Sequence, residues 1–327
     1  MAISAGPDSG NLRTVFSASI MSPHSPLASI DIGSNSILLL VGRMHQGKLQ
    51  IQRQRKETIR LGGALDAQGQ LEAAAMERGL QCLRRYAELI RDIPSSHRRA
   101  VATQTLREAS NRDTFLQAAS EILQCRVELI SGEQEARWIY RGVTALFPEQ
   151  AEQRLVIDIG GRSTEICVGE GHTLHSAASY AVGSVAWAQR FFPNGSLAAS
   201  DFAQAIQAAQ QVLQPALEQL RTHAWQQVYG SSGTAGAISK ALHHMGEPPG
   251  LITRPALLQL QQQLAQASHI DRLPLAGLRD DIKPVIGGGV SLMCAVFQLF
   301  GIEQLRVTQG SLRHGLLLST AQELSLI

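Results

Sequence analysis

Apolar runs of strand length that contain an acid and end at a glycine occur twice along the chain. The first contains Asp31 and is followed by another apolar run that stops at Gly42. The second contains Asp158 and repeats the same Asp-x-Gly-x-x-Ser pattern before apolar residues resume and stop at Gly169. Each copy has the pattern of a buried strand, a tight loop and a returning strand. Their similarity at this separation predicts two related domains.

Helix and strand patterns alternate along the rest of the chain, which predicts an α/β fold. Apolar residues three and four positions apart indicate amphipathic helices, and short apolar runs between them indicate strands. The stretch 147–153 is the favoured linker between the two halves. Further strands are expected at 48–60, 100–103, 127–130, 173–178, 227–230 and 305–308, and helices at 71–93, 110–123, 131–146, 184–192, 200–222, 236–245, 255–267, 287–300 and 311–324.

Length, charge and cysteine usage narrow the class of protein. The 327 residues are enough for two domains, and a formal net charge of +2 gives no electrostatic case for binding nucleic acid or a membrane surface. The four cysteines are scattered and form no metal-binding pair, which fits a cytoplasmic location. Residues 1–26 are rich in Ser, Pro and Gly and lack a secretory signal pattern, so we expect a disordered leader there.

The two glycine-containing loops have the chemistry of phosphate sites. Glycine leaves backbone N–H groups uncovered, so that a phosphate can approach them. The adjacent carboxylates can hold a hydrated divalent cation against that phosphate. For either copy alone an ordinary glycine-rich turn is the alternative, and the duplication favours the phosphate interpretation. Two later glycine-rich segments, 230–236 and 287–289, each lead into a predicted helix, whose N-terminus can also bind an anion.

Several common site motifs are missing from the sequence. It has no P-loop glycine–lysine motif, no Gly-x-Gly-x-x-Gly, no His-Glu-x-x-His and no Gly-x-Ser-x-Gly. These absences argue against P-loop, dinucleotide-binding, zinc-protease and esterase functions.

Five short motifs follow one another along the chain in a fixed order. They are Ile-Asp-Ile-Gly-Ser-Asn-Ser at 30–36, Thr-Leu-Arg-Glu-Ala at 105–109, Ile-Ser-Gly-Glu-Gln-Glu-Ala-Arg at 130–137, Ile-Asp-Ile-Gly-Gly-Arg-Ser-Thr-Glu at 157–165 and Gly-Ser-Ser-Gly-Thr at 230–234. In this order they resemble the exopolyphosphatase / guanosine-pentaphosphate phosphohydrolase family. The resemblance covers residues from about 27 to the end of the chain.

The resemblance implies two actin-like (ribonuclease-H-like) domains with a cleft between them. The boundaries that it implies are 27–135 for the first domain and 136–310 for the second. The C-terminal helix, 311–327, would pack back against the first domain. The chain resembles a short, two-domain form of the family, because longer members carry additional C-terminal domains.

The resemblance also implies a hydrolase assisted by Mg²⁺. Inorganic polyphosphate is the expected substrate, from which terminal orthophosphate would be released, and guanosine pentaphosphate is the alternative. Glu135 would be the general base, a role that Glu165 could share, and Arg107 would pair with phosphate oxygens. Asp158 and Glu165 would hold the Mg²⁺, with Asp31 able to join them. The backbone amides expected to bind phosphate are in the loops that contain Gly33, Ser34, Asn35, Gly160, Gly161, Arg162, Ser163, Ser232, Gly233 and Thr234.

Four positions depart from the family pattern. Arg162 stands where a third glycine is usual, Gln134 where a second acid is common, and Ile282 and His314 where the family has an arginine and a glutamate. Two further functions stay open: an actin-fold ATP-dependent kinase, and a non-catalytic sensor of polyphosphate or guanosine tetraphosphate. The departures leave Glu135 and the acidic loop residues in place, so the hydrolase interpretation is retained. A homodimer is compatible with the sequence, which does not define the oligomeric state.

Overall fold

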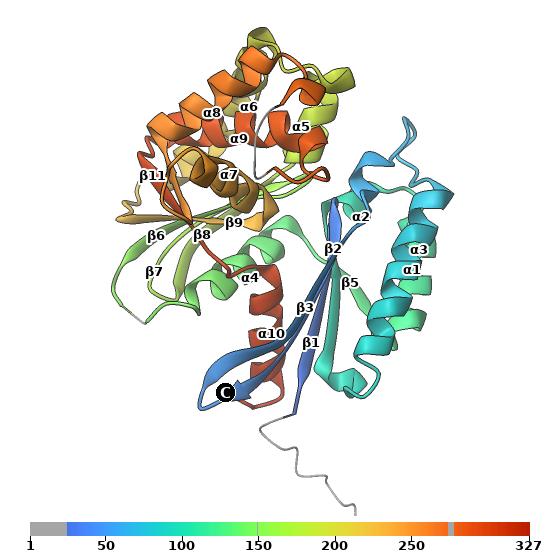
Figure 1. Cartoon of the computed structure of the whole chain (residues 1–327). Coiled ribbons are helices and arrows are strands. Elements are labelled where there is room, and N and C mark those ends of the chain that lie inside the picture. The colour runs from blue at the N-terminus through green and yellow to red at the C-terminus, as the bar shows by residue number, and fades with distance from the viewer. Residues whose placement is uncertain (1–24, 149, 274–277) are drawn as a thin grey trace, which may run out of the picture.

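Two β-sheets form the centres of two lobes in the computed structural model, which describes residues 25–148, 150–273 and 278–327 (Figure 1). Residues 1–24 of the predicted leader lie outside this range. The strands are β1 (Leu27–Ile32), β2 (Ser36–His45), β3 (Lys48–Thr58), β4 (Arg98–Ala102), β5 (Val127–Leu129), β6 (Gln153–Ile159), β7 (Thr164–Glu170), β8 (Thr173–Tyr180), β9 (Gln227–Ser231), β10 (Leu251–Thr253) and β11 (Gln304–Val307). The helices are α1 (Ala73–Leu89), α2 (Gln104–Glu108), α3 (Arg112–Leu123), α4 (Gly132–Thr144), α5 (Ser184–Phe191), α6 (Ala199–Leu220), α7 (Ser232–His244), α8 (Arg254–Ala267), α9 (Ile286–Leu299) and α10 (Leu312–Glu323).

The first sheet has the strand order β3-β2-β1-β4-β5. Strands β1 to β3 form an antiparallel meander, and β4 and β5 run parallel to β1. Helices α1 and α3 cover one face (Figure 1), where Tyr86 and Phe115 are buried among the aliphatic residues of β1 and β2. Strand β3 lies at the edge and is mostly exposed, which explains its polar sequence.

The second sheet has the order β10-β11-β9-β6-β7-β8. Strands β6 to β8 form a meander like that of the first sheet, β9 and β11 run parallel to β6, and β10 is antiparallel to β11. Helices α5 to α9 gather on one side of this sheet (Figure 1). Their apolar faces form the largest buried cluster of the described chain, with α9 almost entirely enclosed.

Each sheet contains a three-stranded meander, and the strand that pairs with its first strand from outside the meander runs parallel to that first strand. This duplicated ribonuclease-H-like topology confirms the predicted α/β class with two actin-like domains. Helix α2 was not expected from the sequence, because its five residues are little more than one turn and show no clear helical period. Strand β10 was also not expected.

Helices α4 and α10 pack against each other and lie between the two sheets. On its other side, α10 contacts β1 and β2. A Cβ atom on Gly142 would lie 2.1 Å from the Ser311 carbonyl oxygen, and one on Gly315 would lie 2.0 Å from the Trp138 carbonyl oxygen. The two helices therefore touch backbone to backbone, at a distance that only glycine permits.

We expect Gly142→Val to lower the free energy of unfolding by about 3 kcal/mol, because the added side chain must push α10 away. Urea unfolding measures this effect. Gly236→Ala is the matched control, because a Cβ there meets open space and alanine favours a helix. Equal stability of Gly142→Val and the wild type would contradict the close helix contact.

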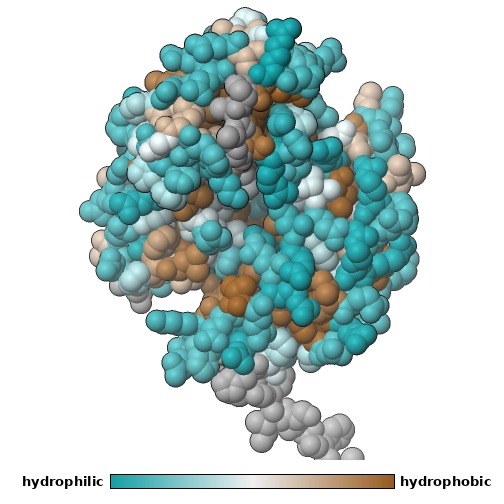
Figure 2. All heavy atoms as spheres, viewed as in Figure 1, coloured by the Kyte–Doolittle hydropathy of each residue, from teal (hydrophilic) through white to brown (hydrophobic). Residues whose placement is uncertain are grey.

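Hydrophilic residues cover most of the face that Figure 2 shows, and hydrophobic residues form small separate groups on it. None of the described helices combines the length and the apolar character that crossing a membrane requires.

Candidate active site

A cavity of about 440 Å³ lies between the two lobes, and this volume is within the range of small-molecule sites. The loops that follow β1 and β6 and the first turn of α7 contribute to its wall. Arg107 and Arg162 do not line the cavity. Most of the predicted site residues do line it: Asp31, Gly33, Ser34, Asn35, Glu135, Asp158, Gly160, Gly161, Ser163, Glu165, Ser232, Gly233 and Thr234.

Sheet register brings the acidic residues of the second lobe together. Asp158 lies directly opposite Glu165 in the antiparallel pairing of β6 and β7, so both side chains are on the same face of the sheet. Both residues are buried. The Ser179 hydroxyl donates a hydrogen bond to Glu165 Oε1 at 2.7 Å, which fixes the orientation of that carboxyl group. Asp31 has the corresponding position in the first lobe, near the end of β1.

Four carboxyl groups share the cavity, and burial raises the pKa of each. The pKa values of Asp31 and Asp158 rise to about 6, and that of Glu135 rises to about 7. At Glu135 the Arg107 guanidinium opposes the effect of burial on the pKa. Burial also raises the pKa of Glu165 well above its usual range, and the nearby Glu135 and Asp158 add to that shift. Such a group of perturbed carboxyls is typical of functional sites.

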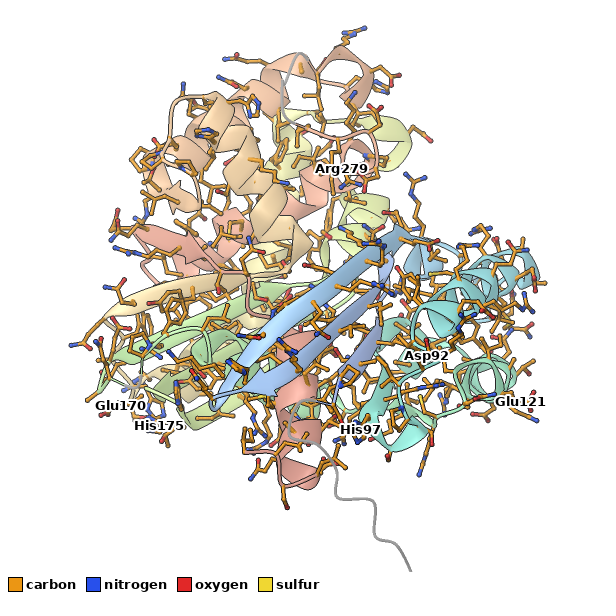
Figure 3. All side chains as sticks on the ribbon, turned by 60° about the horizontal axis from the view of Figure 1, so that its bottom comes forward. Asp92, His97, Glu121, Glu170, His175 and Arg279 are labelled. Carbon is orange, nitrogen blue, oxygen red and sulfur yellow. The ribbon has the colours of Figure 1, made fainter. Side chains whose placement is uncertain are left out.

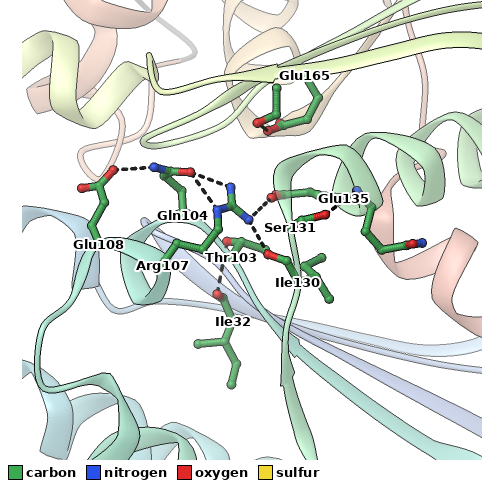
Figure 4. A network of polar contacts seen from close by, with 11 residues as sticks. Ile32, Thr103, Gln104, Arg107, Glu108, Ile130, Ser131, Glu135 and Glu165 are labelled. Atoms are coloured by element: carbon green, nitrogen blue, oxygen red, sulfur yellow. Dashed lines mark hydrogen bonds and ion pairs between the residues drawn. The ribbon is translucent and has the colours of Figure 1, made fainter.

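Glu135 is held in place from two directions. It lies in the first turn of α4, where the N-cap Ser131 Oγ accepts a hydrogen bond from the Gln134 amide at 3.1 Å. Arg107 Nη1 donates to Glu135 Oε2 and to the Ile130 carbonyl oxygen, both at 2.9 Å (Figure 4). The sequence predicted that Arg107 would contact phosphate. In the structure its guanidinium orients the Glu135 carboxylate, and its contact with phosphate stays a prediction.

Arg162 makes its contacts in the first lobe. Its Nε donates to Glu108 Oε2 at 2.7 Å, and its Nη1 donates to the Gly62 carbonyl oxygen at 2.7 Å. The guanidinium is therefore engaged outside the cavity. The predicted role of Arg162 in phosphate binding stays a prediction, and this geometry gives its side chain no part in it.

Arg313, in the first turn of α10, was missed by the sequence reasoning. Its side chain lines the cavity and is only 8% exposed, and the positive charge lowers the pKa values of Asp31 and Asp158. Across the described residues, its buried Nη1 finds no hydrogen-bond partner. One signal was available in the sequence. A cation in the first turn of a helix opposes the helix dipole, so it needs a compensating anion.

Three further cationic residues line the cavity: Lys56 on β3, Lys240 on α7 and Arg279. Arg279 is paired with Asp281 at 2.8 Å, and Figure 3 shows it on the second lobe. The sequence did not indicate these residues, because they are far apart along the chain and belong to no motif. They give the cavity positive groups in addition to its carboxyls.

The carboxyl groups supply the oxygen ligands that Mg²⁺ prefers. The described residues contain no cluster of three or more side chains with the geometry of a preformed metal site. That result does not conflict with Mg²⁺, which commonly uses one or two carboxylates and takes its other ligands from water and phosphate. Asp158 and Glu165, adjacent in the sheet register, fit such a partial set.

Comparison with known proteins gives matches along most of the chain. Residues 40–324 match the family model described as the Ppx/GppA phosphatase family. A curated relative from Vibrio vulnificus (strain YJ016), named guanosine-5′-triphosphate,3′-diphosphate pyrophosphatase, is 41% identical over 302 residues. That alignment covers 92% of this chain and 60% of the relative, so the chain spans about three fifths of the relative's length.

Solved structures support the fold. A crystal structure described as an exopolyphosphatase from Cytophaga hutchinsonii is 24% identical, with a TM-score of 0.81, and the match covers 91% of this chain and 98% of that one. The Ppx-GppA enzyme of Aquifex aeolicus is also 24% identical, with a TM-score of 0.74, over 90% of this chain and 99% of that one. The family match, the shared fold and the arrangement of acidic loops agree, and the chain belongs to the Ppx/GppA phosphatase family.

Proposed function

We propose that this protein hydrolyses a terminal phosphoanhydride bond and releases orthophosphate, with guanosine pentaphosphate as the first candidate substrate. The observation that carries the proposal is the cavity itself. It combines two glycine loops, a buried carboxylate with a pKa of about 7 and a buried arginine nitrogen that has no partner among the described residues. These groups suit a terminal phosphate and an attacking water.

The residues of the chain divide the task between binding and proton transfer. The backbone amides of 34–35, 161–163 and 232–234 hold the phosphate oxygens, whereas the Gly33 and Gly160 amides donate within their own loops, to Ser36 and Ser163. Arg313 donates to one phosphate oxygen through its Nη1. Glu135, oriented by Arg107, accepts a proton from the attacking water. Asp158 and Glu165, with Asp31 nearby, would hold Mg²⁺, which when bound neutralises the charge that develops on the phosphate oxygens.

The sequence alone favoured inorganic polyphosphate as the substrate. The name of the Vibrio vulnificus relative supports guanosine pentaphosphate instead. The sequence of that relative is 41% identical to this chain, whereas the sequence of the exopolyphosphatase structure is 24% identical. Orthophosphate release from guanosine pentaphosphate, short polyphosphate and long polyphosphate, measured side by side with Mg²⁺, tests both substrates. We expect the highest kcat/KM with guanosine pentaphosphate. A higher value with polyphosphate would reverse the order of substrates, and no release from any of the three would reject the hydrolase.

We expect the rate of phosphate release to rise with pH through about 7 and then level off. The base must be ionised to accept a proton, and burial raises the pKa of Glu135 to about 7. Below pH 6 the rate should fall about tenfold for each pH unit, as the carboxylate is protonated. A pH–rate profile at saturating substrate and Mg²⁺ measures this dependence, and a maximum below pH 6 would contradict Glu135 as the base.

Magnesium should stabilise the protein more at pH 8 than at pH 5. The pKa values of Asp31 and Asp158 are raised to about 6, so without a cation the stability that these groups contribute is lost as pH rises through 6. A cation relieves this loss only when the carboxyls are ionised. At a concentration of about 100 Kd, we expect an increase of about 5 °C in Tm at pH 8 and a much smaller one at pH 5.

Thermal unfolding with EDTA and with Mg²⁺ measures this difference. In Asp158→Asn the increase in Tm at pH 8 should shrink, because one ligand is lost. Equal increases at both pH values would show that the cation binds elsewhere.

A further inference from the structure

The predicted phosphate loop of the second lobe, 160–163, contacts the first lobe through the side chain of Arg162. Arg162 lies between β6 and β7, and it donates to Glu108 at the end of α2 and to the Gly62 carbonyl oxygen. About four fifths of its side chain is shielded from solvent. The contact is therefore not a loose surface pair of the kind that usually contributes little.

The packing around this contact is tight. A Cβ atom on Gly62 would lie 2.9 Å from Arg162 Cδ, 2.9 Å from Ser34 Cβ and 3.0 Å from Thr105 Oγ1. The Gly62 amide donates to the Ser34 carbonyl oxygen at 2.7 Å. The Arg162 stem thus packs on the Gly62 backbone, next to the first phosphate loop.

From Glu108 the hydrogen bonds continue to Glu135. Gln104 Nε2 donates to Glu108 Oε1 at 2.7 Å, and Gln104 Oε1 accepts from Arg107 Nε at 2.9 Å. Arg107 then donates to Glu135 (Figure 4). Each member uses a different atom for each neighbour, so the series is continuous from Arg162 to the Glu135 carboxylate.

We propose that Arg162 is a positioning residue that holds the two lobes together and, through Glu108, Gln104 and Arg107, fixes the orientation of Glu135. The proposal rests on the proposed function for the role of Glu135. The charged members of the series alternate in sign, so each holds the next by an ion pair or a charge-assisted hydrogen bond. Arg162, at the position where the family motif usually has a glycine, therefore affects Glu135 from outside the cavity and does not touch the substrate.

Kinetics of Arg162→Gly and Glu108→Gln test the coupling. We expect each variant to lower kcat about tenfold and to change KM less than about twofold, because the phosphate loops stay intact while the base loses its orientation. The double variant should be no slower than the slower single variant, because both break the same series. Arg162→Lys, which keeps the charge, should recover part of the rate.

Arg137→Gln is the matched control, because Arg137 pairs with Glu133 at 2.7 Å on the exposed side of the same helix that carries Glu135. It should leave kcat and KM unchanged. Two kinetic outcomes would overturn the proposal. One is a rise in KM at constant kcat in Arg162→Gly, which would make Arg162 a substrate ligand. The other is multiplicative losses in the double variant, which would make the two residues independent.

Hydrogen exchange measured by mass spectrometry tests the same coupling without activity. In Arg162→Gly we expect faster exchange at 61–64, at 104–109 and in the first turn of α4, where the Glu135 amide donates to the Ser131 carbonyl oxygen. Faster exchange confined to 61–64 and 160–163, or none, would overturn the proposal. This measurement decides the question even if the wild type releases no phosphate, an outcome that would reject only the proposed function.

Discussion

Replacing Glu135 by glutamine lowers the rate of orthophosphate release by about 10²- to 10⁴-fold, the range that a general base contributes. Glutamine keeps the size of the side chain and can still accept the hydrogen bond from Arg107, but it cannot take a proton from water. The buried carboxylate has a pKa of about 7, so at pH 8 it is mostly ionised and available as a base. KM should change little, because the phosphate loops are untouched.

Glu133→Gln is the control for this prediction. Glu133 lies in the same helical turn and pairs with Arg137, but both side chains are more than half exposed. Its removal should leave the rate within a factor of two. Similar rates for Glu135→Gln and the wild type would remove Glu135 from the mechanism and leave Glu165 as the remaining candidate base. A far-ultraviolet spectrum and Tm for each variant separate a chemical loss from an unfolded protein.

The fold was readable from the sequence because its signals are local. The two Asp-x-Gly-x-x-Ser hairpins, with Asp31 and Asp158 at equivalent positions, indicate the duplicated meander directly. In such a hairpin, the apolar pattern of each strand and the glycine loop that interrupts it lie within a short stretch of sequence, so both can be recognised without knowledge of tertiary contacts. The acidic residues of the site were found for the same reason, since both Asp158 and Glu165 belong to one hairpin.

The partners of these residues could not be found in this way, because they depend on tertiary contacts. Arg107 and Arg162 were both predicted to face phosphate, yet one holds Glu135 and the other crosses to Glu108. The motif fixes where an arginine occurs along the chain but not which way its long side chain turns. Arg313 was missed because α10 reaches the cavity only through its packing on α4 and β1.

Arg313→Met should have the second large effect on the rate of phosphate release. Among the described residues, Arg313 is the one cation in the cavity that lowers the pKa values of both Asp31 and Asp158. Methionine fills a similar volume without a charge. We expect kcat/KM to fall about 10²-fold, as for the loss of one preorganised donor to a developing anion. Release of orthophosphate from guanosine pentaphosphate at several substrate concentrations measures this. Arg306→Met on β11, an exposed arginine that does not line the cavity, is the control.

The stability of Arg313→Met should depend on pH in a definite direction. The pKa values of Asp31 and Asp158, already raised by burial, rise further when the cation is removed. The stability that these groups contribute when protonated is therefore lost as pH rises through those raised values. With the cation gone, the cost of ionising two buried carboxyls at pH 8 is uncompensated, and we expect a loss of about 3 kcal/mol. At pH 5 both groups are protonated in the folded state, and the loss should be smaller. Urea unfolding at the two pH values measures the difference. A loss that is equal at both would mean that Arg313 stabilises the fold by packing alone. Its Nη1, which has no partner within the described parts of the chain, would then have no electrostatic role in the cavity.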